Sequence, residues 1–586
     1  MMVGLLVNQL TKGEYPMKKL FSLILALCML CMAASALAYT AGDYTATGAG
    51  LNGPIEVTVT FEADKIADIK IGAHAETPGI SDPAFAKVPA AIIAGQTLNV
   101  DVVAGATFTS KGILEAVEAA VVLAGGDMEA LKASGAAEAV KAEDEVLTYD
   151  VVVIGGGAAG IAAASEAKDA GASVLLLEKQ AGMGGNTIIS GGIIYATGTQ
   201  AQKDAGIEDS VEALVDYWFQ RAEGNADKAL LTMVAEKSNA TIEWLQAGGV
   251  QLGNLGPTGL SPVPRALYTA NGGSGFIVPM AQLIQNKGVD VRTETPAVAL
   301  LTNEAGAVVG VEAIAADGHK VTVNAKSVVI ATGGFDGSQA MMRKYSPEYA
   351  DELFYAAAGN TGDGINMAIE VGADTVFKGG VIGLRGILPT SFADATNGLV
   401  WMPYLMVNEI GERFINESTD YPVVHTALAK QHHAYLIFDA TQMSAAVVAG
   451  LIDEGYAFTG NTLEELADAM KVDEATFLAT VARYNELKGQ EDVDFGKAAA
   501  AMTGVGEGPY CAVRVRPATI GTMGGIKVDL DMHVLKADGT AISGLYAAGA
   551  CANGDFFYKE YPASGTSIMM CFTVGRIAGA NAAAGK

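Results

Sequence analysis

Two tyrosines stand in segments that fit proton chemistry, Tyr421 at the end of FINESTDY and Tyr561 at the start of YPASG. A phenol has a reference pKa of about 10 and can act as a general acid without placing a fixed charge in a pocket. Hydride addition to a conjugated C=C bond puts negative charge on the carbonyl oxygen, which hydrogen-bond donors stabilise, and leaves one carbon in need of a proton. The alternative is that both tyrosines are core or rim residues with satisfied hydroxyls.

A second pattern is a glycine turn in LTYDVVVIGGGAAGIAAASEAKDAGASVLLLEKQ, which predicts a strand, a turn, a helix and a second strand. Gly155, Gly157 and Gly160 have the spacing GxGxxG, and Glu178 ends the second strand. The glycines permit a tight turn and let a pyrophosphate approach N–H groups at the helix N-terminus, while the acid accepts hydrogen bonds from ribose hydroxyls. Because every part of this unit is in place, it predicts dinucleotide binding.

Later segments fit the same sheet. The stretches GVDVRTETPAVALLTN and KSVVIATGGFDG predict strands, and TGDG at 361–364 and GLYAAGA at 544–550 are two further glycine turns. The region of about 382–520 lies between these turns, has no such glycine turn of its own and is more helical. We therefore interpret it as an inserted second domain.

The chain before this domain predicts a small separate unit. GPIEVTVTFEADKIADIKIGAH indicates two alternating strands, and DVVAGATFTSKGILEAVEAAVVLAGG ends in a helical pattern with Ser110 as the predicted N-cap. Residues 129–147 are rich in Ala, Lys and Glu and predict a helical or loose linker.

The N-terminus has the features of an export signal: a basic Met17-Lys18-Lys19, the apolar run LFSLILALCMLCMAA, and Ala36-Leu37-Ala38 as a small-x-small cleavage site. We therefore expect an exported protein in the cell envelope or secreted. The formal charge of −28 argues against nucleic acid as a partner. The cysteines after residue 38 form no CxxC pair, so we expect no metal, haem or iron–sulfur site.

The order and spacing of GGGAAG, GMGGNTIISGG, ATGG, TGDG and GLYAAG resemble the flavoprotein subunits of the fumarate reductase and succinate dehydrogenase family, over roughly 148–586. Its soluble branch includes fumarate, urocanate and ketosteroid enzymes. The resemblance implies FAD in the glycine turn and a capping domain at 382–520. It implies FAD contacts at Gly155, Gly157, Ala159, Gly160, Glu178, Asn186, Thr187, Gly191, Gly192, Thr332, Gly333, Asp363, Ser567 and Ile568.

The first unit resembles the FMN-binding domain of flavinylated exported proteins. Its D-x-x-[SA]-G-A-T motif reads DVVAGAT here, from Asp101 to Thr107. The resemblance implies FMN bound covalently to Thr107 as a phosphoester, added by a flavin transferase. It also implies an electron path from a membrane donor through FMN and FAD to a small-molecule substrate. The alternative for the motif is a strand-to-helix turn with a capping Thr.

The resemblance further implies roles for the tyrosines. Fumarate reductases of the family carry an Arg shortly after an RF-x-NE motif, and Tyr421 takes that position after RFINE at 413–417. The His residues of their HHTMGG stretch are absent from IGTMGG at 520–525, and YKEYPASGTS at 558–567 lacks their C-terminal Arg. Ketosteroid dehydrogenases instead carry a Tyr after NE and a second in Y-P-x-x-G. There Tyr561 and the Gly565 N–H would polarise a carbonyl oxygen and Tyr421 would move the proton.

These patterns predict the class α/β: a Rossmann-like FAD-binding domain with an inserted α+β capping domain, preceded by a small α+β FMN-binding domain. The predicted boundaries are 1–38 for the extension and signal peptide, 39–128 for the FMN-binding domain, 129–147 for the linker, 148–381 and 521–586 for the FAD-binding domain, and 382–520 for the cap. The predicted activity is FAD-dependent oxidoreduction of CH–CH groups in anaerobic respiration, reducing the C=C bond of an enone or an α,β-unsaturated acid.

Three alternatives stay open. The first is a ketosteroid-type dehydrogenase that runs the reaction in reverse. The second is a urocanate or fumarate reductase with a remodelled carboxylate site, for example through Arg265 or Arg385. The third is a non-catalytic flavin electron shuttle. Lesser candidates near the tyrosines are His425, Tyr558, Lys559 and Ser564.

Overall fold

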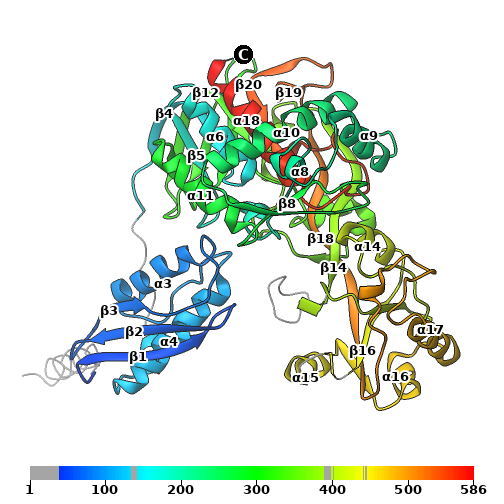
Figure 1. Cartoon of the computed structure of the whole chain (residues 1–586). Helices are drawn as coiled ribbons and strands as arrows, with labels where there is room; N and C mark the ends of the chain where they lie inside the picture. The colour runs from blue at the N-terminus through cyan, green and yellow to red at the C-terminus, as the bar shows by residue number, and fades with distance from the viewer. Residues whose placement is uncertain are drawn as a thin grey trace, which may run out of the picture. The chain divides into compact units, whose positions relative to one another are not determined.

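The computed structural model describes residues 39–133, 141–387, 398–399, 401–439, 441–442, 445–453 and 455–585. They form two compact units (Figure 1). The first contains 39–76, 84–103 and 107–133, and the second contains 77–83, 104–106 and the described residues from 141 onward. The predicted signal peptide and part of the predicted linker lie outside the described residues. Within those residues, no helix has the length and apolar character needed to cross a membrane.

The first unit is an antiparallel sheet packed against helices. Its sheet has the order β1–β2–β3. The alternating pattern of PIEVTVTF buries Ile55, Val57 and Val59 on one face, as expected for a sheet covered on one side. Its elements are β1 (Gly42–Ala49), β2 (Pro54–Phe61), β3 (Ile66–Ile71), α3 (Asp82–Gly95), α4 (Thr107–Leu123) and α5 (Met128–Ala133).

The second unit is built on an eight-stranded sheet. Four neighbouring pairs, β12–β4, β4–β5, β5–β9 and β12–β20, are parallel, and the remaining pairs are antiparallel. The central strands end in the buried runs VVVI, VLLL and SVVI, which is typical of strands covered on both faces. The strands are β4 (Glu145–Ile154), β5 (Val174–Leu177), β9 (Asp290–Arg292), β10 (Ala297–Thr302), β11 (Val308–Ile314), β12 (Lys320–Ile330), β19 (His533–Leu535) and β20 (Ala541–Ala547).

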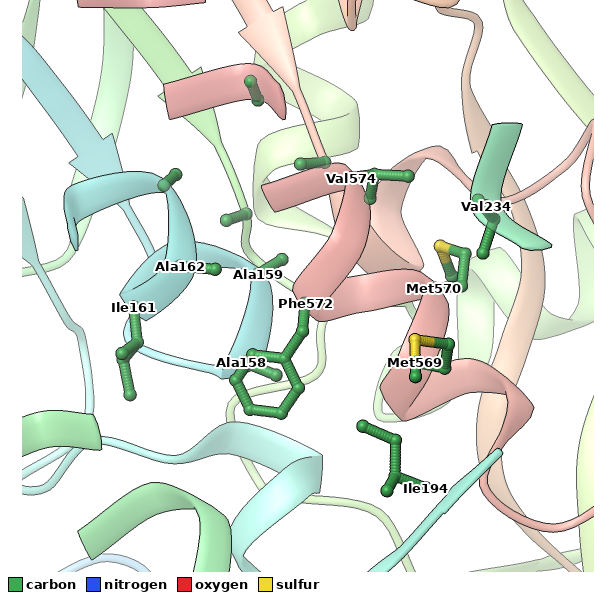
Figure 2. Close-up of a cluster of buried hydrophobic side chains, with 14 of the residues drawn as sticks. Ala158, Ala159, Ile161, Ala162, Ile194, Val234, Met569, Met570, Phe572 and Val574 are labelled. Carbon is green, nitrogen blue, oxygen red and sulfur yellow. The ribbon is translucent and has the colours of Figure 1, made fainter. Parts of the chain in front are cut away.

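Two helices from opposite ends of this unit's sequence pack tightly on one another, α6 (Ala158–Asp169) and α18 (Thr566–Ala584). Figure 2 shows Ala158, Ala159 and Ala162 of α6 beside Phe572 of α18. A Cβ at Gly575 or Gly579 of α18 would lie 2.3 Å from the Ala159 carbonyl oxygen or 2.1 Å from that of Ala163. The small residues therefore let α18 approach α6 closely, which places the N-terminal end of α18 beside the glycine turn.

Further elements complete this part of the unit. A small sheet has the order β6–β8–β7. The remaining elements are α7 (Gly185–Ile188), β6 (Ile193–Tyr195), α8 (Gln200–Asp204), α9 (Val211–Arg221), α10 (Lys228–Ala247), β7 (Leu252–Gly256), β8 (Ala266–Thr269), α11 (Ser274–Asn286), α12 (Gln339–Tyr345), η1 (Pro347–Tyr349), α13 (Asp363–Glu370) and η4 (Gly549–Ala552).

The region predicted as an insertion contains a second, mixed sheet with helices around it. Two long antiparallel strands, β14 (Thr375–Gly386) and β18 (Tyr510–Ile526), run through the predicted boundaries at 382 and 520. They therefore carry the cap on a continuous two-stranded ribbon. The other elements are β13 (Leu353–Phe354), β15 (Leu405–Asn408), α14 (Tyr421–Leu428), β16 (Ala434–Asp439), α15 (Ala445–Asp453), β17 (Ala457–Gly460), α16 (Leu463–Met470), α17 (Glu474–Glu486) and η3 (Ala499–Ala501).

The structure confirms the predicted fold class, with α/β and α+β parts in the expected segments. One local prediction was wrong: α4 begins at Thr107, so Ser110 lies inside its first turn and is not the N-cap. The Ser110 hydroxyl instead accepts a hydrogen bond from the Val103 N–H, at 3.1 Å, and so holds the loop before the helix. A Ser in this motif can satisfy backbone N–H groups from either place, which is why the pattern alone misplaced the start.

Candidate functional site

A cavity of about 900 Å³ lies within the second unit. Its size is within the range of small-molecule and cofactor sites. The walls come from the glycine turn before α6, the N-terminal end of α18, the inner part of β14 and the loop before α14. Most residues predicted for FAD or catalysis line it: Gly155, Gly157, Ala159, Glu178, Asn186, Thr187, Gly191, Thr332, Gly333, Asp363, Tyr421, Tyr561, Gly565, Ser567 and Ile568.

The glycine turn opens α6 toward this cavity. Gly155 has φ +106°, and a Cβ there would lie 2.4 Å from the Ala331 carbonyl oxygen. Gly157 is the N-cap of α6 and provides no side-chain cap. The only atom near a Cβ at Gly157 would be the Gly184 carbonyl oxygen, at 3.8 Å. Gly157 and Ala159 line the cavity, so the N-terminal end of α6 lies at the cavity wall, where a helix N-terminus can bind a phosphate group.

Glu178 sits behind the same turn and is buried. One carboxylate oxygen accepts the Gly156 N–H at 2.8 Å, and the other accepts the Gln180 N–H at 2.7 Å. Burial raises the pKa of Glu178 above its ordinary value. The carboxylate therefore shapes the turn, and its remaining lone pairs are the acceptors predicted for ribose hydroxyls.

Two other predicted FAD residues lie near one another on the cavity wall. Lys179 donates to Asp363 and to the Thr361 hydroxyl, each at 2.6 Å. The hydroxyl of Thr332 is buried and has no hydrogen-bond partner in the described part of the chain. A buried hydroxyl without a partner is costly, so it fits a site that a polar ligand completes. Together with the open helix N-terminus, it fits FAD.

Three residues predicted to contact FAD, namely Gly160, Gly192 and Asn186, make packing contacts or hydrogen bonds within the protein. Gly160 and Gly192 do not line the cavity. A Cβ at Gly160 would lie 1.8 Å from the Gly155 carbonyl oxygen, and one at Gly192 would lie 2.4 Å from Gly272, so both are needed for close packing. Asn186 lines the cavity, but its amide donates to the Ile520 carbonyl at 3.0 Å and accepts the Ala357 N–H at 2.7 Å. It joins this wall to β18.

Tyr421 is the first residue of α14, and the residue before it fixes its place. The Asp420 carboxylate caps the helix through the Tyr421 N–H. The same carboxylate accepts the Gly259 N–H at 2.7 Å and the Ser564 hydroxyl at 2.7 Å. Because Ser564 lies in the YPASG turn, Asp420 holds the loop of Tyr421 against the turn of Tyr561.

The two tyrosine rings lie side by side in the cavity. Their centroids are 6.5 Å apart with 24° between the planes, and the Trp401 ring contacts Tyr421 edge-on at 6.0 Å. Burial, with the Asp420 charge added, raises the pKa of Tyr421 above its ordinary value. Burial and the nearby Tyr421 also raise the pKa of Tyr561 well above its ordinary value. Both phenols therefore keep their protons at neutral pH.

The Tyr561 hydroxyl has a defined partner. It accepts the Ser567 N–H at 2.9 Å, so its own proton is available to another acceptor. Gly565, the N-cap of α18, has φ +92°, and a Cβ there would lie 2.9 Å from the Ile194 carbonyl carbon. Only glycine fits at this point. The phenol and the N-terminal end of α18 thus face the same part of the cavity.

A buried group of charges lies beside the loop of Tyr421. Glu417, on the cavity wall, accepts two hydrogen bonds from Arg413 and one from Lys497, all at 2.9 Å. Arg413 also pairs with Asp492 at 2.8 Å, and Lys497 donates to the Tyr484 hydroxyl at 2.6 Å. No local sequence pattern connects Lys497 or Asp492 with RFINE, so neither residue is predicted from the sequence.

The two arginines named as a possible carboxylate site differ in their surroundings. Arg265 is fully buried, forms a two-bond pair with Asp209 at 2.7 and 2.6 Å, and does not line the cavity. Arg385, on β14, lines the cavity. The structure therefore brings only Arg385 to the site.

The lesser candidates are also placed. Ser564 lines the cavity, whereas Tyr558 and Lys559 do not. His425 lies one turn after Tyr421 on α14, is buried, and contacts both Glu352 oxygens at 2.9 and 3.0 Å. It is therefore engaged in a pair behind the cavity wall.

The first unit presents Thr107 in an open turn. Thr107 is half-buried at the start of α4, and Gly105 before it has φ +85° with no atom within 4 Å of where its Cβ would be. Val102 and Phe108 nearby are 41% and 44% exposed. A half-buried Thr at the N-terminal end of a helix, beside exposed apolar side chains, fits a bound flavin phosphate.

Comparison with known families matches both units. Residues 150–568 match the FAD binding domain family, and residues 50–122 match the FMN-binding domain family. Among curated proteins, the NADH:acrylate oxidoreductase of Vibrio harveyi is 32% identical over 93% of this chain, and the urocanate reductase of Eggerthella lenta is 33% identical over 92%. The chain spans 61% of the length of the first relative and 92% of the second.

Solved structures show the same fold. The open conformation of a flavocytochrome c3 fumarate reductase matches with a TM-score of 0.62 and 32% identity, over 75% of this chain and 78% of that one. The 3-ketosteroid-Δ4-(5α)-dehydrogenase of Rhodococcus jostii matches with a TM-score of 0.61 and 28% identity, over 76% and 99%. The chain therefore belongs to the fumarate reductase family of FAD-dependent flavoprotein oxidoreductases and carries an FMN-binding domain before its FAD-binding domain.

Proposed function

We propose that this protein is an exported, flavin-dependent reductase of activated C=C bonds, with Tyr421 as proton donor. Its substrate is an enone or an α,β-unsaturated acid. The observation that carries the proposal is the pair of phenols, with ring centroids 6.5 Å apart, in the cavity that the glycine turn also lines. The reductases among its relatives support the same reaction class.

The turn of Tyr561 would stabilise the charge that develops in the reaction. Bound FAD, once reduced, would supply the hydride for the carbon of the C=C bond that lies β to the carbonyl group. The Tyr561 hydroxyl, whose acceptor side is taken by the Ser567 N–H, can donate to the carbonyl oxygen. The Gly565 N–H is the second donor. Two such donors would contribute several kcal/mol of transition-state stabilisation.

Tyr421 would complete the reduction by protonating the other carbon. Its ring is held between Tyr561 and Trp401, and the Asp420 cap fixes the start of its helix. Since burial raises its pKa, the phenol is in the acid form before each turnover. It transfers one proton, and the resulting phenolate is reprotonated before the next cycle.

A ketosteroid-type dehydrogenase is the second candidate, because the same two phenols serve the reverse reaction by microscopic reversibility. The likeness to a ketosteroid dehydrogenase structure supports it. The exported FMN domain favours reduction. Fumarate is a dianion, and its two carboxylates would need more than one cationic partner, whereas urocanate has one carboxylate and would need one. A non-catalytic electron shuttle would not need a substrate cavity beside the FAD-binding turn.

The test uses the holoprotein, produced together with a flavin transferase and reduced by a viologen without oxygen. We expect steroid enones or cinnamates to reoxidise the reduced protein. The decrease in the absorbance of the reduced viologen measures the rate. Faster reoxidation by fumarate, a dicarboxylate, than by either group would contradict the proposed substrate class. A flavin-loaded protein that none of these compounds reoxidises would contradict the reductase proposal.

We also propose that FMN is attached to the Thr107 hydroxyl and passes electrons from a membrane donor to FAD. The open turn and the match to the FMN-binding domain family support this proposal. Thr107→Val should remove one FMN phosphoester from the intact mass and abolish flavin fluorescence on denaturing gels. Thr109→Val, two residues further along α4, is the matched control and should keep the flavin. Retention of covalent FMN by the Thr107 variant would contradict the assignment.

A further inference from the structure

We propose that Arg385 binds a carboxylate of the substrate, and that the substrate class is therefore the α,β-unsaturated monocarboxylic acids. This inference rests on the proposed function and narrows it. It distinguishes acids with one carboxylate from enones, which have none, and from dicarboxylates, which have two.

The first argument is the incomplete bonding of a buried guanidinium. Arg385 is 4% exposed and lines the cavity. Its Nη2 donates to the Met402 carbonyl oxygen at 3.3 Å, whereas Nη1 is buried and has no hydrogen-bond partner among the described residues. A buried donor without an acceptor costs free energy, more so when the group is charged. The position therefore fits a group that gains its partner from a ligand.

The second argument is the balance of buried charge around the cavity wall. Glu417 is close enough to favour the charged form of Arg385, but both of its oxygens already accept from Arg413 and Lys497. Asp492 pairs with Arg413. This group of five described residues therefore contains three cations, Arg385, Arg413 and Lys497. It contains two anions, Glu417 and Asp492. An anion bound at Arg385 would balance the group, and burial lowers the pKa of Arg385 to about 10 in its absence.

The third argument limits the ligand to one carboxylate. Among the described residues that line the cavity, Lys179 and Arg385 are the only Lys, Arg or His side chains, and Lys179 is paired with Asp363. A second carboxylate would therefore lack a cationic partner. Ile382, Leu384 and Trp401 line the same cavity and offer apolar surface for an alkyl or aryl remainder.

The test compares compounds that share one skeleton. Cinnamate carries the carboxylate, while methyl cinnamate and 4-phenylbut-3-en-2-one keep the conjugated C=C bond without it; acrylate and fumarate vary the size and the number of carboxylates. In the reduced holoenzyme we expect a monocarboxylate to have the highest kcat/KM. Arg385→Gln should raise its KM by about 10- to 150-fold, the effect of losing hydrogen bonds to a charged group, and leave the ester and ketone unchanged.

A binding measurement separates this inference from the reaction itself. We expect 3-phenylpropanoate to raise the Tm of the oxidised wild-type holoprotein but not that of Arg385→Gln. Arg385→Lys, which keeps the charge, should restore part of the shift and is the variant to use if the Gln variant does not fold. Preference for the ketone with no effect of Arg385→Gln would overturn the inference and keep the proposed function. A ligand-induced shift without turnover of any compound would keep the carboxylate site and overturn the proposed function.

The sequence also offers an internal anion, Asp394, which lies outside the described residues. Asp394→Asn therefore serves as a control. It should leave the KM for the monocarboxylate unchanged. Equal losses of Tm in Asp394→Asn and Arg385→Gln, with unchanged substrate preference in both, would show a pairing within the chain and overturn the inference.

Discussion

Replacement of Tyr421 by Phe is expected to lower the turnover of the unsaturated substrate by about 10²- to 10⁴-fold, the usual contribution of a general acid. The variant keeps the ring that contacts Tyr561 and Trp401, so FAD content and Tm should change little. The measurement is anaerobic reoxidation of the reduced holoprotein under saturating substrate. KM should stay within a few-fold, because the phenol acts on the reacting carbon in the transition state.

The matched control is Tyr404→Phe. Tyr404 lies in the same region, its hydroxyl donates to the Gln442 carbonyl at 2.9 Å, and it does not line the cavity. That variant should turn over like the wild type. Because burial raises the pKa of Tyr421, the phenol should lose its proton only above the ordinary pKa of about 10, so its contribution to kcat should stay level up to that pH. Unchanged turnover in Tyr421→Phe would make Tyr421 a structural residue.

Replacement of Glu417 by Gln is expected to destabilise the capping region by about 3–5 kcal/mol, the range for breaking a buried ion pair. Glu417 has no exposed side-chain surface and accepts hydrogen bonds from Arg413, from Lys497 and from the Met406 N–H. Removing its charge leaves two buried cations with only Asp492 between them. Urea unfolding, followed by the intrinsic fluorescence of the three tryptophans, measures the change.

The matched control is Glu486→Gln on α17, which makes the same chemical change in the same region. Glu486 pairs with Arg483 on the surface, with 66% of its side chain exposed, so the urea midpoint should hardly move. Equal effects of the two substitutions would show that the buried charges of Glu417, Arg413 and Lys497 contribute no more than a surface pair.

Much of the fold could be predicted from local sequence patterns, because such a pattern determines the backbone conformation and burial of its own segment. The apolar runs VVVI and VLLL, the GxGxxG spacing and Glu178 specify a strand–turn–helix–strand unit through backbone conformation and burial alone, and the structure confirms it. The start of α4 was missed by four residues, since a Ser in this motif can satisfy N–H groups from inside the helix. Boundaries depend on such competing hydrogen bonds more than on periodicity.

The candidate site divides in the same way. The sequence by itself determined the glycine turn, the acid behind it and two tyrosines in distinctive segments, because each needs only its neighbours along the chain. Only the tertiary structure placed Asp420 against Ser564, gave Glu417 its partner Lys497, and left the Arg385 Nη1 without a hydrogen-bond partner among the described residues. The physical reason is that charge pairing and burial depend on which distant segments meet, and no local spacing records that meeting.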